Sequence, residues 1–111
     1  MCDKDKLALL GILDSILQTD IYLADQDSYS DWVKDSKTVD ACLMHLINIG
    51  EMVNRLSEPF TSANQEIDWY RIRGLRNIIA HDYFGIDYRE IWSILTIHVP
   101  LLKFHIIQVL S

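Results

Sequence analysis

The chain has 111 residues, of which 50% are hydrophobic, and it carries a formal net charge of −6. This length suits one domain, expected over residues 1–111, and excludes a second core of similar size. The acidic balance excludes broad, non-specific coating of nucleic acid. The hydrophobic fraction predicts a second buried surface, typically that of a homodimer. The low counts of glycine (4) and proline (2) favour helices over a many-stranded β fold.

Helical periodicity marks the first half of the chain. Leucines and isoleucines recur at helical spacing along residues 5–24, which predicts the first helix. Residues 25–31 are polar and rich in potential N-caps, so they predict a connection. A second, long helix is expected from about Trp32 to Leu56. Its inner face is expected to include Val39, Leu43, Leu46, Ile47, Val53 and Leu56. Residues 60–67 are polar and without a periodic pattern, and they are expected to be irregular.

The two later helices are marked by residues that start and stop helices. The third should begin at Trp69 after the N-cap Asp68 and break at Gly85. The last should follow Asp87, which stands in a carboxylate-x-x-Glu capping pattern, and should be kinked or interrupted at Pro100. Four main helices predict an all-α, up-and-down four-helix bundle.

The third helix carries the side chains best suited to chemistry. Arginine offers a planar, permanently charged fork for phosphate, and histidine exchanges protons near neutral pH. At about 100° per residue, the apolar residues of this helix share one sector. The opposite sector holds a polar set: Arg73, Arg76, Asn77, His81 and Tyr83.

The spacing within this set suggests how a site is assembled. Asn77 and His81 are four residues apart and therefore stacked, so the amide could orient the imidazole. Arg76 and His81 lie about 140° apart on an ideal helix and do not aim at one phosphate. Either the helix loosens near His81, or a second subunit completes the site. We favour the second subunit, because the hydrophobic excess already predicts a dimer.

Other residues leave more than one interpretation open. An Arg-x4-His spacing occurs often by chance, and His81 could simply interact with a helix dipole. Glu51, beside Gly50 on the second helix, could pair with an arginine of the third helix or be solvated. Structural roles are expected for the remaining histidines, which are His45, His98 and His105. No histidine or cysteine stands at metal-ligand spacing, so no metal and no other cofactor is predicted.

The expected location is the cytoplasm, with no membrane contact. The two cysteines suggest a reducing compartment, and the charged N-terminus does not resemble a signal peptide. The most apolar segment, Ile94 to Leu110, is a poor membrane span. It is interrupted by four residues: His98, Pro100, Lys103 and His105.

The segment from Trp69 to Asp87, WYRIRGLRNIIAHDYFGID, resembles the signature of the HepT-like family of HEPN domains. Ile49-Gly50-Glu51 resembles the Gly-Glu element of that family's second helix. Ile91-Trp92 and Val99-Pro100-Leu101-Leu102 resemble its closing helix. The resemblance covers nearly the whole chain, and the Arg-x4-His-x-Tyr motif is intact.

The resemblance implies an all-helical, homodimeric, metal-independent endoribonuclease. Such proteins are toxins of the type VII toxin–antitoxin class, whose antitoxin is a minimal nucleotidyltransferase. By this match Arg76 and His81 take the catalytic positions, and Asn77 takes the polar position beside the arginine. Tyr83 takes the position of the tyrosine that the partner modifies with AMP. Arg73 and Glu51 are interpreted as supporting residues.

Two other functions fit the same residues. The chain could be a non-catalytic helical accessory subunit of a nucleotidyltransferase, one that helps to hold a nucleotide or substrate. It could also be a dimeric scaffold whose Arg/His face is only an anion patch. Cutting of RNA that depends on His81 would separate the enzyme from both.

Overall fold

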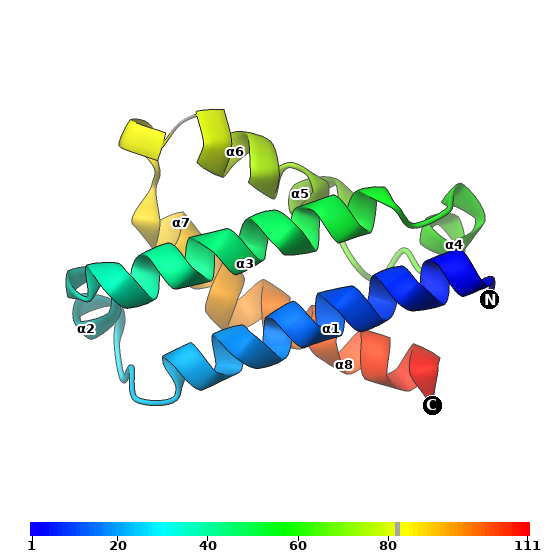
Figure 1. Cartoon of the computed structure of the whole chain (residues 1–111), viewed down its shortest axis with the longest axis horizontal. Helices are drawn as coiled ribbons and strands as arrows, with labels where there is room; N and C mark the ends of the chain where they lie inside the picture. The colour runs from blue at the N-terminus through cyan, green and yellow to red at the C-terminus, as the bar shows by residue number, and fades with distance from the viewer. Residues whose placement is uncertain (82) are drawn as a thin grey trace.

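The computed structural model describes residues 1–81 and 83–111, with only the backbone at Tyr83, and every element in this part is helical (Figure 1). The long segments are α1 (Asp3–Leu23), α3 (Ser36–Asn54), the pair α5 (Trp69–Arg73) and α6 (Leu75–His81), and the run α7 (Tyr88–Ser93), η2 (Ile94–His98) and α8 (Val99–Leu110). Short helices connect them: α2 (Tyr29–Lys34), α4 (Glu58–Ala63) and the 3₁₀ turn η1 (Tyr83–Gly85). Successive long segments run in opposite directions, which confirms the predicted all-α, up-and-down arrangement.

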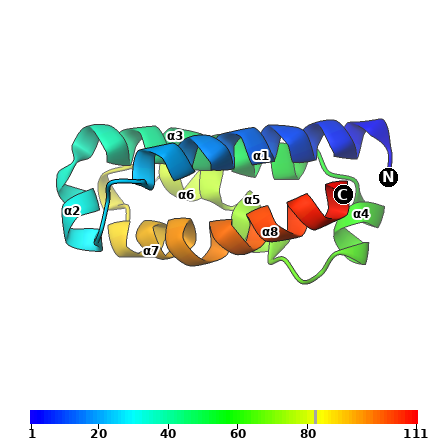
Figure 2. The ribbon, with the colours of Figure 1, turned by 90° about the horizontal axis from the view of Figure 1, so that it is seen from below.

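Helix α3 is the centre of the arrangement. It contacts α1 on one side and α5 and α6 on the other, and α8 packs against α1 (Figures 1 and 2). The apolar residues predicted to face inward from this helix are buried, apart from the half-buried Ile47: Val39, Leu43, Leu46, Ile47, Val53 and Leu56. The helical period therefore predicted the inner face of α3 correctly.

Two predicted boundaries are wrong because polar caps interrupt the periodic pattern. The second helix is not continuous from Trp32. Ser28 caps the short helix α2, and Asp35 ends it and caps α3 by accepting a hydrogen bond from Thr38 N. The region after α3 is not wholly irregular, since Ser57 caps α4 within it. Each cap satisfies a backbone N–H that the first turn of a helix leaves free.

The segment predicted as a single third helix is two helices. Asp68 is its N-cap, as predicted, but α5 ends at Arg73 and α6 begins at Leu75. Gly74 between them has φ −72° and ψ −13°, so its ψ departs from the α-helical value of about −42°. The chain bends there.

The last helix has the predicted cap and the predicted irregularity. Asp87 accepts hydrogen bonds from the backbone N–H groups of Arg89 and Glu90. A π turn, η2, lies immediately before α8, in which Pro100 occupies the first turn. Because proline has no N–H, the Thr96 carbonyl four residues earlier has no α-helical partner. The interruption therefore lies just before Pro100.

Two strips of exposed apolar side chains lie on α1 and on the last helix. The α1 strip is Leu7, Leu10, Leu17 and Ile21, and the second strip is Ile97, Leu101, Phe104 and Ile107. Leu10 and Leu17 share the helical spacing that predicts the first helix, but they are exposed because they point away from the side of α1 that meets α3 and α8. No large apolar residue of α6 is exposed in the part of the chain described, so the apolar excess lies away from that helix.

The run Tyr88–Leu110 is long and apolar enough by composition to cross a membrane, with a mean hydropathy of 1.5. Its inner side, however, belongs to the core of the bundle. The buried residues of this run are Ile91, Ile94, Leu95, Val99, Leu102 and Ile106. Core packing therefore accounts for one side of the run, whereas only 28% of its apolar window is buried and the strip from Ile97 to Ile107 is exposed. By composition the run is not the poor span expected.

Candidate functional site

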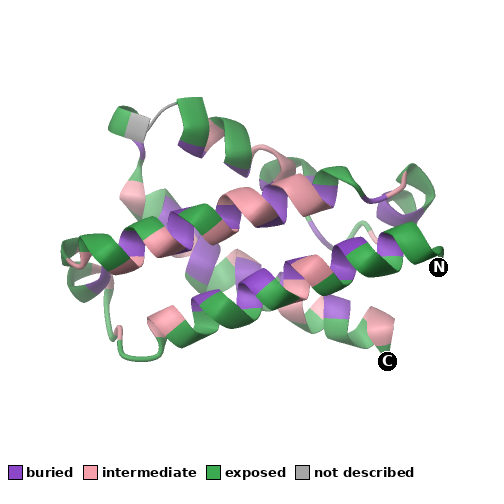
Figure 3. Cartoon of the chain, in the orientation of Figure 1, coloured by how far each residue is buried: buried purple, intermediate pink, exposed green. Residues whose placement is uncertain are grey.

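Helix α6 divides into a buried and an exposed side, as its period predicts. Leu75 and Ile79 are buried against α3, and Ile72 on α5 continues this inner side. The exposed positions of α6 include three residues proposed for chemistry: Arg76, Asn77 and His81. The bundle therefore holds α6 by one side and leaves its polar side free (Figure 3).

Glu51 on α3 forms an ion pair with Arg76 through Oε1 and Nε. Gly50 allows α3 to pack closely on α5 beside this ion pair, because a Cβ at position 50 would lie 3.1 Å from the Ile72 carbonyl oxygen. Of the two interpretations that the sequence left open for Glu51, the structure shows the paired one. About half of each side chain is exposed (52% for Arg76 and 42% for Glu51), so the pair contributes about 1 kcal/mol or less to stability.

The three arginines of the motif segment differ in their partners. Arg71 lies 3.5 Å from Asp68 and 3.8 Å from Glu90, and Arg76 pairs with Glu51. Arg73 forms no ion pair in the described part of the chain. Its Nε is buried there without a hydrogen bond, which leaves a donor unsatisfied at a cost of about 1–3 kcal/mol.

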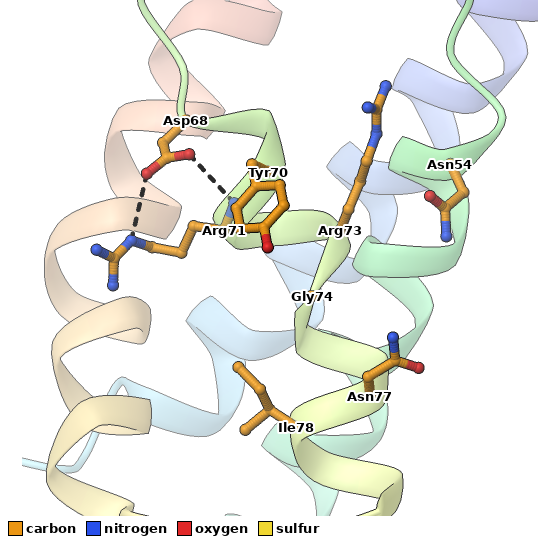
Figure 4. Close-up of a pocket in the computed structure, with 8 residues that line it drawn as sticks. All are labelled: Asn54, Asp68, Tyr70, Arg71, Arg73, Gly74, Asn77 and Ile78. Atoms are coloured by element: carbon orange, nitrogen blue, oxygen red, sulfur yellow. Dashed lines mark hydrogen bonds and ion pairs between the residues drawn. The ribbon is translucent and has the colours of Figure 1, made fainter.

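Arg73 lines a cavity of about 620 Å³ between α3 and the α5–α6 pair (Figure 4). The other lining residues are Asn54, Asp68, Tyr70, Arg71, Gly74, Asn77 and Ile78. Asn54 and Tyr70 were not predicted from the sequence. Asn54 lies one turn after Glu51 on α3, but only the docking of α3 against α5 brings it beside Arg73.

His81 is exposed at the end of α6, five residues or about 7.5 Å along the helix from Arg76. Asn77 lies one turn before it on the exposed side. Within the residues described, the imidazole of His81 makes no hydrogen bond, either with the side chain of Asn77 or with any other group. The imidazole is thus open to a ligand or to another subunit.

Tyr83, predicted to accept AMP, has its side chain outside the described residues. Its backbone begins η1, two residues after His81. The backbone of Tyr83 therefore lies close in the chain to the end of α6.

The other histidines make contacts that suit the structural roles predicted for them. His45 Nε2 lies 3.5 Å from the Tyr22 hydroxyl oxygen, and His105 Nε2 lies 3.0 Å from Asn64 Oδ1. His98 is half-buried beside a small apolar cavity. Over the described residues, no three His, Cys, Asp or Glu side chains are grouped so that they could hold a metal ion.

Comparison with known proteins identifies the family to which this chain belongs. The model of the "Ribonuclease HepT-like" family matches residues 12–109. The chain belongs to this family. The resemblance noted in the motif segment therefore extends over the whole bundle, and ribonuclease is the activity for which the family is named.

Several proteins resemble this HepT-like chain. A protein of Caldanaerobacter subterraneus named "Putative RNase" is 33% identical over 76% of the chain and 75% of its own length. One of Methanocaldococcus jannaschii with the same name is 33% identical over 90% and 83%. A "Probable ribonuclease HepT" of Thermococcus cleftensis is 32% identical over 68% of each chain. No solved structure matches.

Proposed function

We propose that this HepT-like protein is a metal-independent endoribonuclease toxin whose catalytic residues are Arg76 and His81. The observation that carries the proposal is the exposed side of α6, where both side chains face solvent from a helix anchored by Leu75 and Ile79. The names of the family and of its relatives support RNA as the substrate.

In this mechanism the imidazole of His81 removes the proton from a ribose 2′-hydroxyl. The 2′-oxygen attacks phosphorus, the bond from phosphorus to the 5′-oxygen breaks, and an imidazolium returns a proton to that oxygen. The products are a 2′,3′-cyclic phosphate and a 5′-hydroxyl. Arg76 stabilises the charge that develops on the phosphoryl oxygens. Asn77 orients the imidazole and Arg73 supports binding of the RNA. Glu51 holds Arg76 in the free protein until a phosphate takes its place.

The proposed active form is a cytoplasmic homodimer in which two α6 helices face one cleft. Its support is the large angle between Arg76 and His81 on a helix, which a second copy would compensate. Mixed dimers test this directly. If the pair is shared between subunits, an Arg76→Ala subunit combined with a His81→Ala subunit regains about one functional site in two. If each subunit uses its own pair, the mixture stays as inactive as either parent.

The proposed control is transfer of AMP to Tyr83 by a minimal nucleotidyltransferase antitoxin. The support is the motif match and the place of Tyr83, two residues after His81. A phosphate there would bind the arginine fork, and the nucleoside would block RNA. After co-expression with the partner, mass spectrometry should find AMP on Tyr83, and Tyr83→Phe should escape inhibition. Transfer to another residue would contradict the proposal.

A non-catalytic accessory subunit of a nucleotidyltransferase is the second candidate. It is favoured by Glu51, which occupies the fork of Arg76, and by the exposed apolar strips on α1 and α8. Expression of the chain alone separates the two functions. A toxin slows growth and degrades RNA, and His81→Ala removes both effects. An accessory subunit does neither.

A further inference from the structure

We propose that the cavity between α3 and α5–α6 is a separate RNA subsite, which holds an unpaired nucleobase against Tyr70 and the adjoining phosphate on Arg73. The identity of the ligand as RNA rests on the proposed ribonuclease function. The subsite itself rests on Tyr70, Arg73 and Asn54, which neither transfer a proton nor bind the scissile phosphate in the cleavage chemistry, and it shares Asn77 with the cleavage site.

The charge of the cavity is supplied by Arg73. Its neighbour Arg71 is turned toward Asp68, whereas Arg73 extends alongside Asn54 (Figure 4). Arg76, one turn later, already holds Glu51. Within the described residues, Arg73 is therefore the arginine of this segment without a carboxylate, and its buried Nε lacks an acceptor. A phosphate oxygen is the group that this donor suits best.

The opposite wall of the cavity offers an aromatic ring. Tyr70 is 88% exposed and lines the cavity, and its side chain makes no hydrogen bond or ring contact in the part of the chain that the structure describes. Trp32 and Trp69, by contrast, are buried in the core. Base stacking on an exposed ring is the usual way in which proteins hold single-stranded nucleic acid, and it tolerates any sequence.

Two amides complete the cavity. Asn54 lies beside Arg73 and Asn77 lies below it in Figure 4, and neither amide makes a hydrogen bond to another described residue. Each amide offers donors and an acceptor, which suit the edge of a nucleobase. Ring, amides and cation thus correspond to the face of a nucleobase, the edge of that base and the adjoining phosphate.

The position of the cavity connects it to the proposed cleavage site. Asn77 lines the cavity and also lies one turn before His81 on the exposed side of α6. A strand whose scissile phosphate is at His81 would pass Asn77 to reach Arg73. This arrangement explains how a chain with a net charge of −6 binds a polyanion, since stacking and one local cation replace a broad basic surface.

The test measures binding separately from cleavage. A short fluorescent 2′-O-methyl RNA has no free 2′-hydroxyl, so the proposed chemistry cannot cut it, and its anisotropy reports the dissociation constant. The variants are Tyr70→Ala, Tyr70→Phe, Arg73→Ala and Arg73→Lys. The matched controls are Phe104→Ala, an exposed aromatic on α8, and Lys34→Ala at the end of α2. Circular dichroism establishes that each variant is folded.

Tyr70→Ala should weaken binding about tenfold or more, the loss expected for one stacked base, and Tyr70→Phe should bind like the wild type. Arg73→Ala should weaken binding and lower the slope of log affinity against log salt by about one. Arg73→Lys should keep the slope. The two controls should match the wild type.

Three results would overturn the subsite: no measurable binding of the oligonucleotide, equal binding by Tyr70→Ala and wild type, or equal losses for Tyr70→Phe and Tyr70→Ala. Weakened capture of the nucleotidyltransferase with unchanged RNA binding would assign the cavity to a protein and would also overturn it. If these binding effects occur without His81-dependent cleavage, the subsite stands and the ribonuclease proposal fails. If cleavage depends on His81 but neither binding nor cleavage depends on Tyr70 or Arg73, the ribonuclease proposal stands and the subsite fails.

Discussion

Helices α1 and α6 pack on different sides of α3, and they differ in how many residues they contribute to the core. The buried residues of α1, a 21-residue helix, are Asp5, Ala8, Leu9, Ile12, Ser15, Ile16 and Thr19. Those of the shorter α6 are Leu75 and Ile79. The α1 side therefore contributes more residues to the core, and the α6 side presents the polar residues of the motif. Substitutions on the two sides should separate stability from activity.

The largest expected effect is on the exposed side of α6. His81→Ala should lower the rate of RNA cleavage about 10²–10⁴-fold, because it removes a proton-transfer group, and Arg76→Ala should lower it by a similar amount. The melting temperature should stay within a few degrees of wild type, since both side chains are exposed. Cleavage should persist in excess chelator. Activity that returns only with Mg²⁺ would refute the metal-independent mechanism.

Adjacent positions on α1 give the opposite test. Ile16 is fully buried and Leu17 is 42% exposed, so the same truncation can be compared one residue apart. Ile16→Ala should lower the free energy of unfolding by about 2–5 kcal/mol, through lost burial and a cavity. Leu17→Ala should change it by about 0.5 kcal/mol or less. Urea denaturation measures both, and equal losses would show that Leu17 is packed.

A pH-dependent contribution is expected where α1 meets the connection after α3. Burial alone would raise the pKa of Asp5, but hydrogen bonds from Ser57 Oγ (2.6 Å) and Ser57 N (2.7 Å) outweigh it and leave the pKa below its usual value. This stabilisation is present above the unfolded-state pKa and is lost as the pH falls through the lower folded-state pKa.

Asp5→Asn should therefore lower the free energy of unfolding at pH 7 by about 1–3 kcal/mol, the usual value for hydrogen bonds to a charged group. The difference from wild type should shrink on acidification. Urea titrations at several pH values measure it, with Asp3→Asn, exposed in the same first turn, as the control. A difference that is constant with pH would mean that the charge of Asp5 is not responsible.

The smallest expected effect concerns the ion pair between Glu51 and Arg76. Glu51→Gln removes the carboxylate that competes with phosphate for the arginine, so RNA should bind a few times more tightly. Stability should change by about 1 kcal/mol or less, because the pair is half-exposed. Anisotropy with an uncleavable RNA detects the change, and Glu90→Gln, beside Arg71, is the matched control. Weaker binding would mean that Glu51 holds Arg76 in its binding position.

The periodicity of the sequence correctly predicted which residues of α6 are buried and which are exposed. The burial of Leu75 and Ile79 and the exposure of Arg76 and His81 follow from local geometry, as do the caps at Asp68 and Asp87. The break at Gly74 was missed, because the apolar spacing continues across it from Ile72 to Leu75 and Ile79. The cavity was missed because Asn54 meets Arg73 only when α3 and α5 dock, although Tyr70 lies three residues before Arg73 on α5.

The exposed strips on α1 and α8 have a colloidal consequence. At pH 7 the net charge of −6 keeps copies of the chain apart, but near the isoelectric point of about 4.9 this repulsion disappears while the apolar strips remain. Electrostatic repulsion then no longer opposes the attraction between the apolar strips of different molecules, and solubility should reach its minimum near the isoelectric point. Light scattering during an acid titration should rise near that pH, and replacing Leu101 and Phe104 with glutamine should suppress the rise. The same side chains that lie outside the core of one molecule thus set the conditions under which many molecules stay in solution.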